Sequence, residues 1–77
     1  MASTDRLIVW RRCFDDGSQW EASFQGAFDF DVIVRCDGMG WFEVDGHRTP
    51  MVRFGVDLET GRPEAERRLG LLIEALG

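Results

Sequence analysis

Short turn-forming segments recur along most of this chain and separate runs rich in β-branched and aromatic residues. The turn segments are residues 15–18, 25–27, 37–40 and 45–46, and three of them contain Asp-Gly. Asp-Gly is among the strongest short hairpin signals, because glycine adopts the positive φ that the turn requires. The spacing therefore predicts strands over residues 6–14, 19–24, 28–36, 41–44 and 51–58.

Pro63 begins a different pattern. Proline is favoured in the first turn of a helix, where its missing N–H would be unpaired in any case. Apolar residues then recur at helical spacing, at Ala65, Leu69, Leu72, Ile73 and Leu76. This predicts a helix over residues 63–76, with residues 59–62 breaking the strand pattern before it. A helix this short does not persist alone in water, so we expect its apolar face to pack on the sheet.

Together these patterns predict an α+β fold: an antiparallel β-meander of about five strands with one C-terminal helix packed on one face. The 77 residues suit one small domain over residues 1–77, and we expect residues 1–5 to be disordered. Three Trp, six Phe and an apolar content of 44% exclude a disordered chain, which would be poor in aromatic residues.

Alternation along the predicted strands assigns one face to the core. Its members are Trp20, Ala22, Phe24, Phe28, Phe30, Val32, Val34, Phe42, Val44, Val52, Phe54, Val56 and Leu58. Because core residues must pair with core residues, we expect Phe24 opposite Phe28 and Val34 opposite Phe42. The two hairpin loops would then be residues 25–27 and 37–39.

The second face of the predicted sheet is rich in carboxylates. It carries Glu21, Asp29, Asp31, Glu43, Asp45 and Asp57, against Arg35 and Arg53. In the expected register, Glu21, Asp31 and Asp45 form a row across three adjacent strands. Like charges directly opposite each other are destabilising. Two interpretations follow: a solvated face with flexible carboxylates, or a partner-binding surface.

Trp41 falls on the same acidic face, beside Ile33 and opposite Arg35 in the expected register. An exposed Trp with an apolar neighbour and an Arg has the composition of an interface hot spot. A local Trp–Arg stacking pair that only covers the sheet is the other interpretation. The partner-binding hypothesis therefore includes Trp41, Ile33 and Arg35 together with Glu21, Asp29, Asp31, Glu43 and Asp45.

The first predicted strand is apolar without alternation at Leu7, Ile8, Val9 and Trp10. A run of this kind is buried on both sides or lies in a subunit interface. An edge strand is also a template for pairing with a second chain. These four residues are therefore the candidate interface of a homodimer.

Composition argues against several classes of function. Fourteen acidic residues against nine Arg give a net charge of −5, which repels a nucleic-acid backbone but suits a basic protein surface. His47, Cys13 and Cys36 lack the spacing of a metal site or a catalytic triad, so we expect no enzyme, no metal and no cofactor. Without a membrane-spanning run or a signal-peptide pattern, the expected compartment is the cytoplasm, where both cysteines stay thiols.

In size, acidity and lack of catalytic motifs the chain resembles small phage-encoded inhibitors such as anti-CRISPR proteins. That resemblance of type implies a non-enzymatic inhibitor whose acidic face blocks a basic, nucleic-acid-handling protein. The order of sheet and helix also resembles small antitoxins, which implies the alternative of a dimeric antitoxin or regulatory interaction module.

Overall fold

The computed structural model describes residues 9–76, which form one sheet and one helix. The strands are β1 (Trp10–Arg12), β2 (Gln19–Gln25), β3 (Asp29–Arg35), β4 (Met39–Val44), β5 (His47–Arg48) and β6 (Val52–Arg53), and helix α1 is Leu58–Leu76. All pairings are antiparallel, in the order β1-β2-β3-β4-β5, with β6 also paired to β4. The predicted α+β meander with a C-terminal helix is confirmed. The expected disorder of residues 1–5 concerns residues outside the described range.

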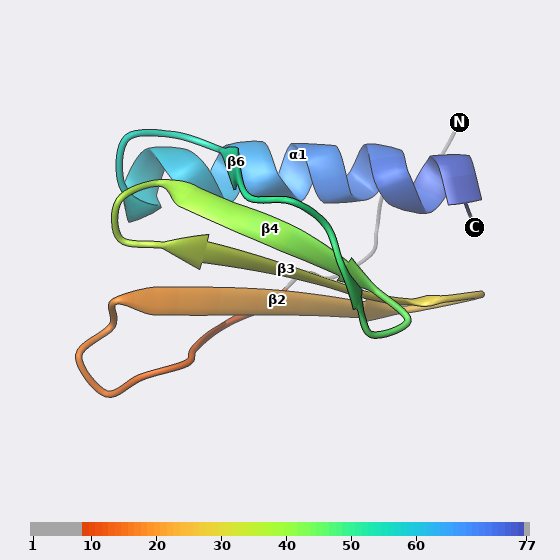
Figure 1. Ribbon diagram of the computed structural model, residues 1–77, viewed down its shortest axis with the longest axis horizontal. Coiled ribbons are helices and arrows are strands. Elements are labelled where there is room, and N and C mark those ends of the chain that lie inside the picture. The colour runs from red at the N-terminus through yellow and green to blue at the C-terminus, as the bar shows by residue number, and fades with distance from the viewer. Residues whose placement is uncertain (1–8, 77) are drawn as a thin grey trace.

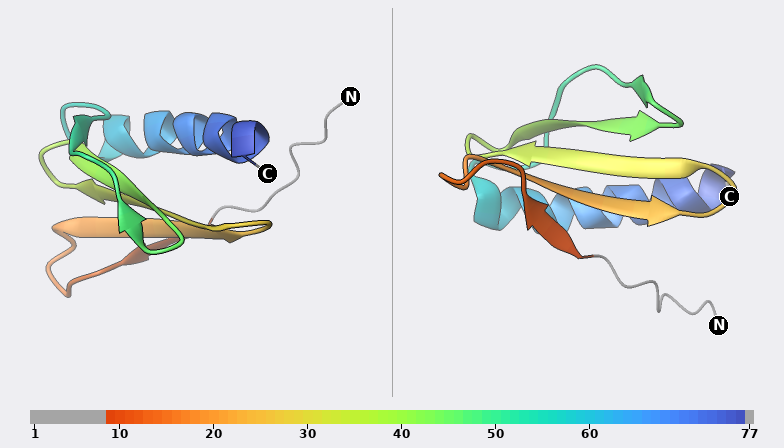
Figure 2. Two further views of the ribbon diagram at one scale, coloured as in Figure 1. Left: turned by 45° about the vertical axis from the view of Figure 1, so that its right-hand side comes forward. Right: turned by 90° about the horizontal axis from the view of Figure 1, so that it is seen from below.

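Helix α1 covers one face of the sheet, the inner face, and packs mainly against β3 (Figure 1). The opposite face, the outer face, carries no other element of residues 9–76. The right-hand view of Figure 2 shows that outer face from below, with β1 at one edge and, at the other, β5 and the loop that leads to β6. The sheet is therefore wider than the helix that covers it.

The helix begins five residues before the predicted start, at Leu58. Asp57 caps it: the Thr60 N–H donates to Asp57 Oδ1 at 3.0 Å, and the Thr60 hydroxyl accepts the Val56 N–H at 2.9 Å. Gly61 then fits where space is short, since a Cβ there would lie 3.0 Å from Val34 Cγ1. The prediction that residues 59–62 break the pattern is wrong, because they form the first turn of the helix.

The predicted strand over residues 51–58 is also wrong in extent. Only Val52–Arg53 pairs with β4, and the chain then turns into the helix cap. A strand that was not predicted, β5, follows the Asp45-Gly46 turn, where φ is 50° and 83°. The turn at Asp45-Gly46 was predicted correctly, but the strand after it was expected at residues 51–58, and the structure pairs Val44 with His47.

Both predicted hairpin registers are wrong by two residues, although every strand faces the predicted side. Phe24 lies opposite Phe30 instead of Phe28, and Val34 lies opposite Gly40 instead of Phe42. Gly40 is required at that point, because a Cβ there would lie 1.9 Å from the Ile33 carbonyl oxygen and 2.8 Å from the Phe54 ring. Phe42 still packs on the core, with its ring edge-on to Phe54 at 5.4 Å between the ring centres.

The core lies between the inner face and the helix. Its buried members are Ala22, Phe30, Val32, Val34, Phe54, Ala65, Leu69 and Ile73. Two residues that were expected there are exposed instead: Phe28 at 36%, in the β2–β3 loop, and Val56 at 72%, just before the helix cap. Phe28 is outside the sheet because β3 begins one residue after it, and Val56 is outside because β6 ends three residues before it.

Candidate functional site

The acidic residues of the outer face lie near one end of the sheet, in two pairs that bridge β3 and β4. Asp31 is opposite Glu43. Asp29 faces Asp45, whose Oδ1 accepts the Asp29 N–H at 2.8 Å. We call these four residues the acidic patch.

The expected row of Glu21, Asp31 and Asp45 does not form, because of the two-residue change in register. Glu21 instead lies opposite Ile33 and pairs with Arg11 at 3.0 Å on the neighbouring strand β1. Glu21 is therefore separated from the acidic patch and is neutralised by a cation of its own.

The acidic patch has local hydrogen bonds but no ion pair to another described residue. The Ser23 hydroxyl donates to Asp31 at 2.5 Å, and the Trp41 indole N–H donates to Glu43 at 3.1 Å. Within residues 9–76, none of the four carboxylates forms an ion pair. Two pairs of like charges thus stand side by side. Arg48 lies opposite Glu43 on β5, but its guanidinium stacks on the Trp41 ring and forms no ion pair with Glu43.

The sequence suggested that Trp41 and Ile33 are exposed beside the acidic patch, and the structure buries both. Trp41 is 9% exposed and Ile33 is 6% exposed, although no element within residues 9–76 covers the outer face. The guanidinium of Arg48 lies 3.9 Å from the centre of the Trp41 ring and shields it. The stacking pair of the second interpretation therefore exists, but its cation is Arg48 and not Arg35.

Arg35 lies further along the outer face, away from the acidic patch. It pairs with Asp37 at 2.8 Å and donates to the Met51 sulfur at 3.7 Å. Trp41 and Ile33 are buried, and Glu21 and Arg35 are held in ion pairs. The acidic patch is therefore the part of the predicted partner-binding set that has no ion pair among the described residues.

Next to Glu21, the Cys13 thiol donates to the Glu21 carboxylate at 3.5 Å. Partial burial, and then the neighbouring carboxylate, raise the pKa of the Cys13 thiol. Both Cys13 and Cys36 are free thiols, and Cys36 is exposed.

The candidate dimer residues are only partly within the described chain. Leu7 and Ile8 lie outside it. Val9 is 58% exposed just before β1. The side chain of Trp10 points from β1 to the helix, where its indole N–H donates to Glu66 at 2.5 Å. Trp10 therefore belongs to the inner side of the sheet edge.

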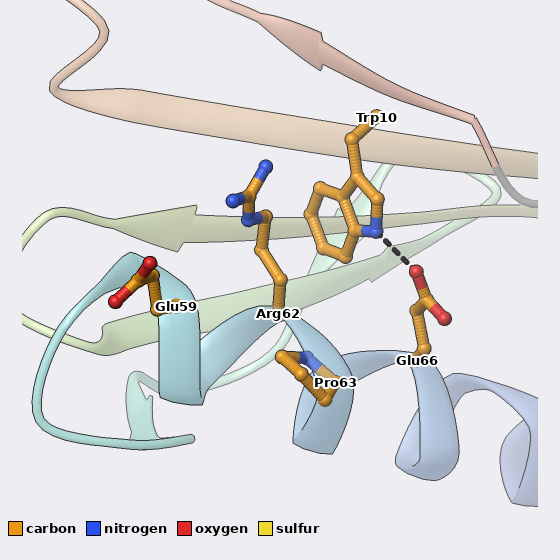
Figure 3. Close-up of a pocket in the computed structure, with 5 residues that line it drawn as sticks. All are labelled: Trp10, Glu59, Arg62, Pro63 and Glu66. Atoms are coloured by element: carbon orange, nitrogen blue, oxygen red, sulfur yellow. Dashed lines mark hydrogen bonds between the residues drawn. The ribbon is translucent and has the colours of Figure 1, made fainter.

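A groove of about 390 Å³ opens there between β1 and the helix. It is lined by Trp10, Glu59, Arg62, Pro63 and Glu66, and we call it the edge groove (Figure 3). The sequence reasoning missed it, because residues 59–62 were assigned to a break and not to a helix. The signal that would have revealed it is the Asp57–Thr60 cap.

The described residues contain no group of three or more His, Cys, Asp or Glu side chains placed to hold a metal ion. No helix within residues 9–76 is both long and apolar enough to cross a bilayer. Comparisons of the chain with protein-family models, with curated proteins and with solved structures gave no match. The site's own geometry is thus the basis for a functional proposal.

Proposed function

We propose that this protein is a non-enzymatic inhibitor that binds a basic, nucleic-acid-handling protein through the acidic patch Asp29, Asp31, Glu43 and Asp45. An anti-CRISPR-type inhibitor is the concrete form of the proposal. The observation that carries it is the set of two facing carboxylate pairs without an ion pair among the described residues. Six of the nine Arg, by contrast, are engaged with a carboxylate or an aromatic ring outside the patch: Arg11, Arg35, Arg48, Arg62, Arg67 and Arg68.

Facing like charges lower the stability of a sheet, and a cationic partner reverses that effect. A groove that binds phosphates presents several Arg or Lys side chains at similar spacing. Docking of the acidic patch on such a groove would block its access to nucleic acid. Complementary charge also raises the rate of encounter between the two surfaces.

The test is a plaque assay in bacteria that carry one active CRISPR system each, across a panel of system types. We expect the wild-type chain to restore phage plaques in at least one strain. The double variant Asp29→Lys with Asp31→Lys should lose this activity, because it reverses charge inside the patch. We avoid Asp45 as a target, because its φ of 50° favours Asp over Lys.

Asp15→Lys with Glu74→Lys is the matched control. It changes the net charge by the same amount at two exposed positions outside the patch, and it should keep the activity. If the patch variant and the control behave alike, the acidic patch is not the binding surface. If no system type is inhibited, the anti-CRISPR form of the proposal is rejected.

A second candidate function, a dimeric antitoxin or regulatory module, is favoured by β1, which is the last strand on one side of the sheet that the described residues form. Its test is coexpression with the product of a neighbouring toxin gene. Rescue of growth by the wild-type chain supports this candidate, and growth arrest in every combination rejects it.

A further inference from the structure

Strand β1 ends the described sheet on one side, and we propose that it pairs with β1 of a second copy of this chain. In the proposed dimer the two strands run antiparallel about a twofold axis at Arg11. Trp10 of each copy then lies opposite Arg12 of the other. Each Arg12 enters the edge groove of the other copy, beside Trp10 and Glu66.

The backbone of β1 has the alternation that this register needs. The Cys13 N–H donates to the Gln19 carbonyl at 2.8 Å, so Cys13 and Gln19 form a hydrogen-bonded pair with β2. In an antiparallel ladder such pairs alternate, so Arg11 also bonds to β2. The N–H and C=O groups of Trp10 and Arg12 therefore face the free edge. An axis at Arg11 brings these groups opposite each other.

The side chains in the edge groove fit an incoming guanidinium. Trp10 lies between Arg62 and Glu66, with Pro63 beside it (Figure 3). Glu66 uses one oxygen, Oε2, to accept the Trp10 indole N–H, and a carboxylate can accept further hydrogen bonds. An Arg side chain along the Trp10 ring would combine cation–π contact with a charge-assisted bond to Glu66.

The charge of the groove also favours a cation. Its helix side presents the two carboxylates Glu59 and Glu66 against the single guanidinium of Arg62. Arg62 is already stacked on the Trp20 ring, 4.9 Å from its centre. The incoming side chain is available, because Arg12 is exposed and donates a long bond of 3.4 Å to the Asp15 carbonyl.

The outer side of the same register brings the two Arg11 side chains together. Each Arg11 is paired with its own Glu21 at 3.0 Å, which reduces their repulsion. The two copies of β3 would lie five strand spacings apart, or about 24 Å. A helix with its side chains is about 10–12 Å wide, so both helices fit on the same face of the joined sheet.

Other registers lack this complementarity. An axis at Arg12 places the two Arg12 side chains directly opposite each other. Arg11 is paired with Glu21 of its own copy, whereas Arg12 forms no ion pair with a described residue of its own copy. An axis at Trp10 places two indoles opposite each other and brings no guanidinium to Glu66. Only the axis at Arg11 places the Arg12 guanidinium of each copy in the anionic edge groove of the other copy.

The inference deepens the second candidate function, which needs a dimer, and is independent of the acidic patch. If the chain proves monomeric, the dimer proposal fails and the acidic-patch proposal is unaffected. Loss of inhibition in the patch variant says nothing about β1. The two failures are therefore distinguishable.

The first experiment measures the mass of the full chain by sedimentation across a concentration series up to about 1 mM, where even millimolar dimers are populated. We expect the wild type to shift from monomer to dimer. Arg12→Pro should remain a monomer, because it removes an N–H that faces the free edge. It leaves the hydrogen bonds between β1 and β2 in place. Arg12→Ala keeps that N–H and should dimerise more weakly than wild type and more strongly than Arg12→Pro.

The second experiment exchanges the charges. Arg12→Glu should raise the dimer Kd about a hundredfold, since each dimer loses two charge-assisted contacts worth about tenfold each. Glu66→Arg alone should weaken the dimer similarly. The double variant Arg12→Glu with Glu66→Arg should restore dimerisation, which a merely structural role of either residue would not produce.

Amide hydrogen exchange tests the dimer on the wild-type chain, so its result does not depend on the folding of any variant. The Arg12 amide should become protected as concentration rises, whereas the Arg11 amide, bonded to β2, should not change with concentration. A wild type that stays monomeric to about 1 mM overturns the proposal. A dimer that persists in Arg12→Pro also overturns it. If the double variant Arg12→Glu with Glu66→Arg does not regain dimerisation, the proposed register is wrong.

Discussion

The inner face of the sheet buries Leu69 completely beneath a helix, whereas the outer face keeps Trp41 9% exposed with no element above it. On the inner face the cover is continuous, from Ala65 through Leu69 to Ile73. On the outer face Trp41 is held between side chains of the sheet itself: Arg48 stacks on the indole, and Glu43 accepts its N–H at 3.1 Å. The same sheet thus excludes water on one side by a packed core and on the other by charged side chains.

This difference has a physical reason and a consequence. A small domain has only one helix available, and it covers only the middle of the inner face. Long side chains can cover apolar surface with their stems while their charged ends remain in water. Such a cover is removed by moving one side chain, so the outer face can be remodelled by a partner without unfolding the core.

The largest effect is expected on the inner face. Leu69→Ala should lower the free energy of unfolding by about 2–5 kcal/mol, because it leaves a cavity in the core. Leu71→Ala is the matched control: Leu71 is 54% exposed, and its loss should change stability by less than about 0.5 kcal/mol. Urea unfolding followed by far-UV circular dichroism measures both. Equal midpoints for the two variants would mean that the helix does not pack through Leu69.

A smaller effect is expected when the cover of the outer face is removed. Arg48→Ala should lower the free energy of unfolding by about 0.5–2 kcal/mol, the range of a cation–π contact. Arg48→Lys keeps a cation and a long stem, so it should retain most of that stability. Acrylamide quenching of tryptophan fluorescence should rise in Arg48→Ala, because Trp41 becomes accessible. Unchanged quenching would show that Trp41 is shielded by something other than Arg48.

The assignment of faces was predictable from the sequence, and the register was not. A period of two places Ala22, Val32 and Phe42 on one side whatever the loops do. A hairpin loop can move by one residue along the chain and keep these faces, so alternation leaves the pairing undetermined. Close packing decides it, at Gly40 beside Phe54 and at Gly38, where a Cβ would lie 2.1 Å from the Gly55 carbonyl oxygen.

The candidate site depended on that register, and so it was only partly predictable. Asp29, Asp31, Glu43 and Asp45 were correctly placed on one face, but Glu21 was grouped with them through the wrong pairing. Trp41 is buried because the Arg48 side chain stacks on the indole ring and does not pair with Glu43, which lies opposite it on β4. No local sequence pattern distinguishes these two contacts, because Arg48 can reach both partners.

A slight gain in stability is expected from the acidic patch. Asp29→Lys with Asp31→Lys turns two pairs of facing like charges into pairs of opposite charge, each worth about 0.2–1 kcal/mol. The gain should shrink as salt is added, since exposed charges are screened. Thermal unfolding at low and high salt measures this, with Asp15→Lys and Glu74→Lys as the charge-matched control. A variant less stable than wild type at low salt would mean that the facing carboxylates do not repel each other measurably.

The smallest effect concerns the thiol of Cys13, which reports how well the outer face excludes water. Cys13 is half-buried, and burial followed by the Glu21 carboxylate raises its pKa. Below that raised pKa the reactive thiolate is scarcer, so Cys13 should react with iodoacetamide more slowly than the exposed Cys36 at pH 8. Glu21→Gln removes the negative charge, lowers the pKa of Cys13 and should speed its alkylation, while Cys36 reacts as before.

Mass spectrometry of peptides from a time course separates the two cysteines. Their rates should converge as pH rises, because a larger fraction of Cys13 becomes thiolate. If Cys13 and Cys36 react equally at pH 8, water reaches the outer face freely beside Glu21. The outer face would then exclude water only around Trp41, and the contrast with the inner face would reduce to a single stacked ring.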